Sequence, residues 1–231
     1  MTKPPSPLAS IALLVERELL AERRSWGWLA SSMLLGLILV VLVGIGFFPE
    51  PAGESKTALT VVALWLGFLF AGTVGVSRNF AGERQLGAFE ALLMLPLERW
   101  TIYLAKVANG LIFLLLTIAV MLLGGVVFAN LRLGEELLGL FLIMLLAAIG
   151  FTAMATLIAA LTSSLRGRDA LLAIALFPPL IPLFLFAAGA TRDLSLGSSI
   201  GEITQAMVSL LGIDALYLAL GVWTFEKVVE A

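Results

Sequence analysis

The sequence contains neither cysteine nor histidine. The absence of cysteine excludes disulfides, thiolate metal sites and thioredoxin-like redox chemistry. The absence of histidine removes the commonest metal ligand, the usual axial ligand of haem and the usual general base. Charged residues are also scarce, at 13% of the chain. We therefore predict no metal site, no firmly bound cofactor and no enzymatic activity of the chain by itself.

Hydrophobic residues make up 61% of the 231 residues, and the mean hydropathy is +1.08. A water-soluble domain of this length needs a polar surface that such a composition does not supply. The five tryptophans and the scattered methionines are most simply interface anchors and packing residues. The composition therefore predicts a multi-pass membrane protein that contacts lipid and not nucleic acid.

Apolar runs long enough to cross a hydrocarbon core recur along the chain, and polar loops separate them. We predict an all-α fold in a single transmembrane domain, residues 1–231, with six membrane-spanning helices. The expected spans cover about 29–48, 58–77, 102–128, 137–161, 170–190 and 206–225.

The stretch 7–25 precedes the first span and differs from it in composition. Its apolar residues recur at helical spacing, whereas its charged residues fall elsewhere on the helical wheel. Ser6 and Pro7 form a typical helix start, with serine as the N-cap and proline at the first helical position. We predict an amphipathic helix that lies along the membrane interface.

The basic residues indicate how the chain is oriented. If both termini are cytoplasmic, eleven of the 14 lysines and arginines lie on the inner side, and only Lys56, Arg132 and Arg192 lie outside. Cytoplasmic loops carry an excess of lysine and arginine, and the outer loops here are short enough for that rule to apply. We therefore predict that both termini face the cytoplasm.

The segment 78–101 is the longest polar interruption in the chain and falls on the predicted cytoplasmic face. Two glycines flank a short amphipathic helical turn within it, and Pro96 ends the helical pattern. A plain connection is usually only a few residues long. We interpret the segment as a helix that docks on a partner, and the alternative is an ordinary solvated loop.

Two further features lie in or beside the later spans. Pro178, Pro179 and Pro182 should kink or unwind the fifth span, which makes either a hinge or substrate-facing surface, or only a static packed kink. Asp214 is the one acidic residue placed deep in the sixth span, and an intramembrane charge is a functional candidate by default. Alternatively, the span begins later and Asp214 caps a helix near the outer interface.

Motifs for catalysis or nucleotide binding do not occur in the sequence. There is no G-x-x-x-x-G-K-[ST] loop to cradle phosphate, no H-E-x-x-H and no G-x-S-x-G. If the protein uses chemical energy, a partner must supply it.

Segment 78–101 contains the pattern E-R-x-x-G-A-x-E-x-L-L-x-x-P. Its residues here are Glu83, Arg84, Gly87, Ala88, Glu90, Leu92, Leu93 and Pro96. With this pattern and the proline-rich fifth span, the chain resembles the membrane subunits of exporter-type ABC transporters. Within that group it is similar to the haem exporter protein B family, whose members are permeases of cytochrome c maturation. The resemblance extends over nearly the whole chain.

The resemblance implies an ABC-2-type permease in a bacterial inner membrane. It implies a partner ATPase subunit that binds ATP, a tryptophan-rich membrane subunit that handles haem, and a second copy of this chain. Haem would be a transient substrate and not a resident cofactor. The residues assigned to ATPase coupling are Phe80, Glu83, Arg84, Gly87, Glu90 and Pro96, with Arg166, Arg168 and Asp169 as either a second contact or anchoring charges.

Three functions remain open at this point. The first is a permease for haem export, or for release of a haem-loaded chaperone, in cytochrome c maturation. The second is a permease for lipid, glycan or drug export. The third is a membrane scaffold that transmits ATPase motion to a partner without transporting anything.

Overall fold

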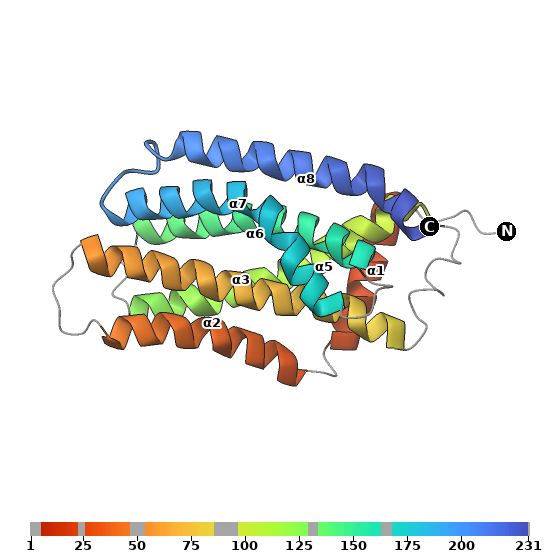
Figure 1. Cartoon of the computed structure of the whole chain (residues 1–231), viewed down its shortest axis with the longest axis horizontal. Coiled ribbons are helices and arrows are strands. Elements are labelled where there is room, and N and C mark those ends of the chain that lie inside the picture. Colours follow the sequence, from red (N-terminus) through yellow and green to blue (C-terminus); the bar gives the residue numbers. More distant parts are fainter. Residues whose placement is uncertain are drawn as a thin grey trace.

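The computed structural model describes residues 6–22, 26–46, 54–85, 97–128, 134–162 and 168–230, and within these ranges the regular secondary structure is helical. Figure 1 shows the helices assembled into one elongated bundle. The helices are α1 (Pro7–Glu22), α2 (Trp26–Gly46), α3 (Glu54–Gln85), α5 (Arg99–Phe128), α6 (Glu135–Thr162), α7 (Arg168–Ser195) and α8 (Thr204–Glu230).

The shorter helix α1 differs from the others in direction. It lies across one end of the bundle and packs against α5, whereas α2, α3, α5, α6 and α8 run along the long axis (Figure 1). Ser6 caps α1 as predicted, because its Oγ accepts from the backbone N–H of Ala9 at 3.4 Å. The last turns of α8 reach the end of the bundle at which α1 lies, which we call the α1 end. The first helix and the C-terminal end of the last helix therefore lie at the same end of the bundle.

In the part of the chain that the structure describes, five helices are long and apolar enough to cross a membrane. Their apolar segments are Ala58–Val76, Arg99–Phe128, Glu136–Thr162, Ala170–Ser195 and Thr204–Lys227. In α2 the described apolar part, Ala30–Gly46, is shorter. Because α2 packs along α3 and α5, the first span, about 29–48, stays a prediction.

Several helices extend beyond the predicted bounds of the spans. The predicted second span ends at residue 77, but α3 continues to Gln85 and so includes the first part of segment 78–101. Gly82 does not stop it, because one glycine costs a helix only about 1 kcal/mol. At the other end of the bundle, α7 continues past residue 190 to Ser195.

The end of α7 is set by a glycine in the left-handed conformation. Gly197 has φ +106°, and its N–H donates to the carbonyl of Leu194 at 3.0 Å. The N–H of Ser198 donates to the carbonyl of Asp193 at 3.1 Å. These two bonds form a Schellman motif, which satisfies the last carbonyls of the helix. Local turn chemistry thus ends the helix a turn later than hydropathy suggests.

Small residues on α3 allow it to approach its neighbouring helices closely. A Cβ placed on Gly67 would lie 3.2 Å from the Cα of Gly36 on α2, and a Cβ on Gly75 would collide with the ring of Phe113 on α5. Without a hydrophobic driving force between helices in lipid, such close packing supplies much of the attraction.

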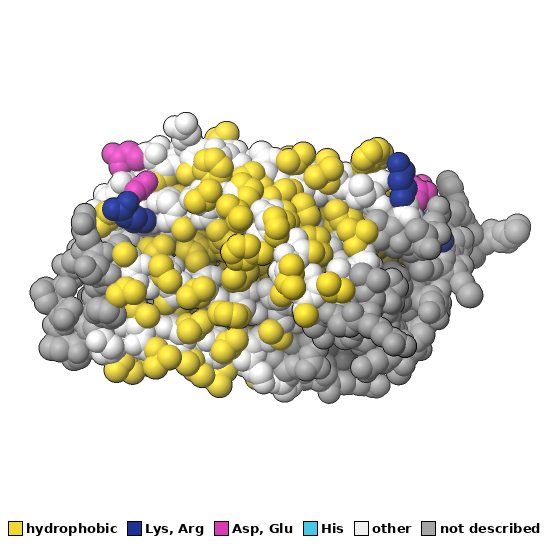
Figure 2. All heavy atoms as spheres, viewed as in Figure 1, with side chains coloured by type: hydrophobic (Ala, Val, Ile, Leu, Met, Phe, Trp, Pro, Cys, Tyr) yellow, Lys and Arg dark blue, Asp and Glu magenta, His cyan; other side chains and the backbone are white. Residues whose placement is uncertain are grey.

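The outside of the bundle is apolar along its middle. Figure 2 shows hydrophobic side chains over the centre of the visible face, while the charged side chains of the described part gather at its two ends. Exposed side chains such as Leu123, Ile174 and Leu185 belong to this belt. A soluble monomer rarely exposes so large an apolar area, so the belt fits contact with hydrocarbon.

Candidate functional site

A buried ion pair joins α1 to α5 at the α1 end. The Nζ atom of Lys106 lies 3.3 Å from Oε1 of Glu18, and the side chain of Lys106 is only 1% exposed. A buried charge is tolerated when it is paired and hydrogen-bonded. The pair therefore ties the predicted interfacial helix to the first turns of a membrane span.

Tyr103 connects three helices close to this ion pair. Its hydroxyl donates to the carbonyl of Ala153 on α6 at 2.9 Å, and its ring lies 5.4 Å from the ring of Phe225 on α8. Gly221 on α8 leaves room for the tyrosine, because a Cβ there would collide with the ring and the hydroxyl. The α1 end is thus a closely packed junction of α5, α6 and α8.

Sequence reasoning does not identify Glu18 or Tyr103, and it places Lys106 only near the start of the third span. A signal was present, since a lysine inside an apolar helix normally requires a partner. The identity of that partner depends on how α1 folds back across α5, which the sequence pattern does not specify.

The residues predicted for ATPase coupling are only partly described. Phe80, Glu83 and Arg84 lie in the last turns of α3, and Arg168 and Asp169 begin α7, but only their backbone is among the described parts. In Figure 1, α3 ends and α5 and α7 begin toward the α1 end of the bundle. Gly87, Glu90, Pro96 and Arg166 lie outside the described residues.

The prolines were expected to kink or unwind the fifth span, and the span stays helical with a kink. Pro178, Pro179 and Pro182 all lie inside α7, and the axis of α7 changes direction along its length in Figure 1. Proline removes a backbone donor and clashes with the carbonyl four residues earlier, which explains a kink. The hydroxyl of Tyr217 on α8 donates to the carbonyl of Pro179. A neighbouring helix therefore supports the bend.

Asp214 lies well inside α8, which begins at Thr204. The alternative that Asp214 caps a helix at the outer interface is therefore wrong. Its side chain is 3% exposed and lies against Gly150 on α6, where a Cβ would collide with Oδ1. Among the described residues, neither carboxyl oxygen has a hydrogen-bond partner. This is a buried acidic group in the interior of the membrane part.

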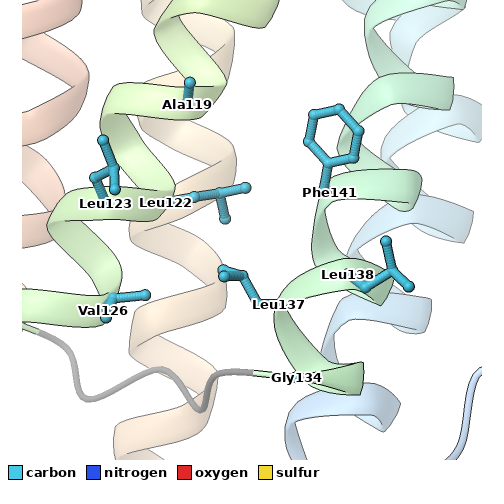
Figure 3. Close-up of a pocket in the computed structure, with 8 residues that line it drawn as sticks. All are labelled: Ala119, Leu122, Leu123, Val126, Gly134, Leu137, Leu138 and Phe141. Carbon is cyan, nitrogen blue, oxygen red and sulfur yellow. The ribbon is translucent and has the colours of Figure 1, made fainter.

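A cavity of about 530 Å³ opens between α5 and α6, toward the end of the bundle opposite α1. Figure 3 shows Leu122 and Val126 of α5 facing it together with Leu137 and Phe141 of α6. Its lining offers no side chain that ligates a metal. Within the described ranges, no group of three His, Cys, Asp or Glu residues is placed to hold an ion. Nothing in this cavity suits haem iron.

The helical bundle, its apolar belt and its charged ends define a multi-pass membrane protein. Residues 9–231 match the family model described as CcmB protein, and the chain belongs to this family. Heme exporter protein B of Rhodobacter capsulatus is 29% identical over 209 residues, which cover 90% of this chain and 92% of that protein. The family expected from the motif around Glu83 and from the proline-rich span is confirmed.

Proposed function

We propose that the protein is the membrane subunit of an ABC transporter complex that acts in cytochrome c maturation. In this proposal it serves haem export or the release of a haem-loaded chaperone. The family match over residues 9–231 carries the proposal, and the name of the relative, Heme exporter protein B, supports it. ATP hydrolysis takes place in a partner subunit.

The structure supports a route for coupling through α3. This helix continues without interruption from the membrane span to Gln85, so a force applied near Glu83 acts on a rigid rod. The next described helix, α5, begins at Arg99 and is joined to α1 by the pair of Lys106 and Glu18. Displacement of the segment between α3 and α5 would therefore move two spans and the interfacial helix together.

The proposed setting is the inner membrane of a bacterium, with both termini cytoplasmic. The α1 end would then face the cytoplasm, which agrees with the ends of α1 and α8 lying together. A second copy of the chain and a tryptophan-rich haem-handling subunit complete the proposed complex. Haem would make only transient contact, because the chain contains no histidine or cysteine to ligate its iron.

Glu83→Lys tests the coupling step. The variant should lower co-purification of the ATPase severalfold in mild detergent, because it reverses a charge in the proposed docking surface while leaving membrane insertion intact. Glu226→Lys is the matched control, since Glu226 is an exposed acidic residue in the last turns of α8. Undiminished ATPase binding by Glu83→Lys, or an equal loss in the control, would contradict the assignment.

The same purification distinguishes the other functions. An ATPase recovered with a tryptophan-rich haem-handling subunit supports the cytochrome c maturation complex. An ATPase recovered with enzymes of lipid or glycan synthesis supports the general export permease. ATP-driven release of a chaperone without haem flux supports the scaffold.

A further inference from the structure

Asp214 has no role in the coupling route, and its surroundings point to a function of its own. It stands ten residues into α8, about 15 Å from the helix start at 1.5 Å per residue. Its side chain is buried against α6 and not exposed to the lipid-facing side. Both carboxyl oxygens lack a hydrogen-bond partner among the described residues. A carboxyl in this position must either find a counter-ion or be neutral.

Among the described side chains, the helices packed against α8 bring no cation to Asp214. The apolar part of α6 contains no charged residue after Glu136, and α7 contains none between Asp169 and Arg192, which stand at its two ends. The neighbours of Asp214 on these helices are Gly150 and Leu183.

The third neighbour, α5, carries Tyr103 and Lys106 at the α1 end. Tyr103 meets α8 at Gly221, two helical turns from Asp214, and its hydroxyl is bonded to Ala153. Lys106 is paired with Glu18 of α1. Neither group is placed to neutralise the carboxyl of Asp214.

Tyr217, one turn along α8, is the remaining titratable group near Asp214. Its hydroxyl donates to the carbonyl of Pro179 and so is directed toward α7. It cannot serve as a cation. An ionised carboxylate buried without a partner costs several kcal/mol, and such groups normally take up a proton instead.

We propose that Asp214 is a proton-binding site inside the membrane, at which the carboxyl carries a proton while α8 is packed on α6 at Gly150. Separation of the two helices would admit water, and the carboxylic acid would then release one proton to that water and become a carboxylate. The packed form binds more protons than the separated form, so raising the pH favours separation. Movement of α8 is thereby linked to a proton, whatever the complex transports.

Infrared spectroscopy of the full chain in lipid nanodiscs decides the question. The difference spectrum between wild type and Asp214→Asn at neutral pH should contain the carbonyl stretching band of a protonated carboxylic acid, and the band should shift in D2O. Asp193→Asn is the matched control, because Asp193 is an exposed carboxyl near the end of α7. Absence of the protonated band from the Asp214→Asn difference spectrum overturns the proposal.

A chemical test on the wild type requires no variant. The hydrophobic reagent dicyclohexylcarbodiimide reacts with protonated carboxyls: the acid O–H adds across one N=C bond, the proton goes to nitrogen, and the adduct rearranges to an N-acylurea. We expect an adduct on the peptide that contains Asp214, formed more slowly as the pH rises. An adduct whose yield does not change between acidic and alkaline pH contradicts a site that releases its proton on opening.

Discussion

Replacing Gly221 by alanine should destabilise the junction at the α1 end. Gly221 lies on α8 directly against Tyr103 of α5, and a Cβ there would collide with the hydroxyl and the ring. Tyr103 is fully buried and its hydroxyl is bonded to the carbonyl of Ala153 on α6. The ring cannot move away without breaking that bond or displacing a neighbouring helix.

Three contributions determine the size of the effect. Overpacking of a closely packed core costs about 1–3 kcal/mol, and loss of the tyrosine hydrogen bond costs about 0.5–1.5 kcal/mol. Alanine in place of glycine favours the helix by about 1 kcal/mol. The net loss for Gly221→Ala is therefore about 0.5–3.5 kcal/mol.

Gly212→Ala isolates the packing contribution. Gly212 is on the same helix, but no atom lies within 4 Å of a Cβ placed there, so this variant changes helix propensity alone. Apparent Tm in detergent, followed by fluorescence-detected gel filtration, should be lower for Gly221→Ala than for Gly212→Ala by about 3 °C or more. Equal Tm values for the two variants would refute the packing argument.

Two further variants test the polar contacts between helices. Lys106→Met removes the cation beside the largely buried Glu18 carboxylate and should lower the free energy of unfolding by about 3–5 kcal/mol. Adding Glu18→Gln should restore most of this loss, because the buried charge is then removed as well. If the double variant does not recover in thermal unfolding, the two residues act separately. Tyr217→Phe removes the donor to the carbonyl of Pro179 and should lower stability by about 0.6–1 kcal/mol, the range for hydrogen bonds in membrane bundles. A Tm identical to that of the wild type would mean that the bend in α7 does not depend on this bond.

The helix boundaries show where sequence reasoning was sufficient and where it was not. Hydropathy located the five described helices that are long and apolar enough to cross a membrane, because transfer into hydrocarbon depends on the composition of about 20 consecutive residues. It ended the second span at 77, whereas α3 continues to Gln85, since hydropathy measures burial in lipid and not helix formation. The three prolines predicted a disturbance of α7, but neighbouring helices keep the chain helical through them.

The sequence predicted some residues of the candidate site but not the contacts that they make. Asp214 was identified because an acidic residue in an apolar run is visible in the sequence. The burial of Asp214 against Gly150 could not be predicted from the sequence, because that contact depends on the rotation of α8 and on its register along α6. The docking residues around Glu83 stay a prediction that rests on their motif, and the co-purification experiment tests it.

By itself the sequence determined the class of the protein, its family and the five described helices that are apolar enough to cross a membrane, because these depend on local composition and on motifs of a few residues. Only the tertiary structure decided which polar groups meet inside the bundle. Lys106 pairs with Glu18 across 88 positions, and Tyr103 reaches the carbonyl of Ala153 across 50. Such pairs are fixed by helix rotation, register and the close approach that glycine permits, and these arise only when the helices pack together.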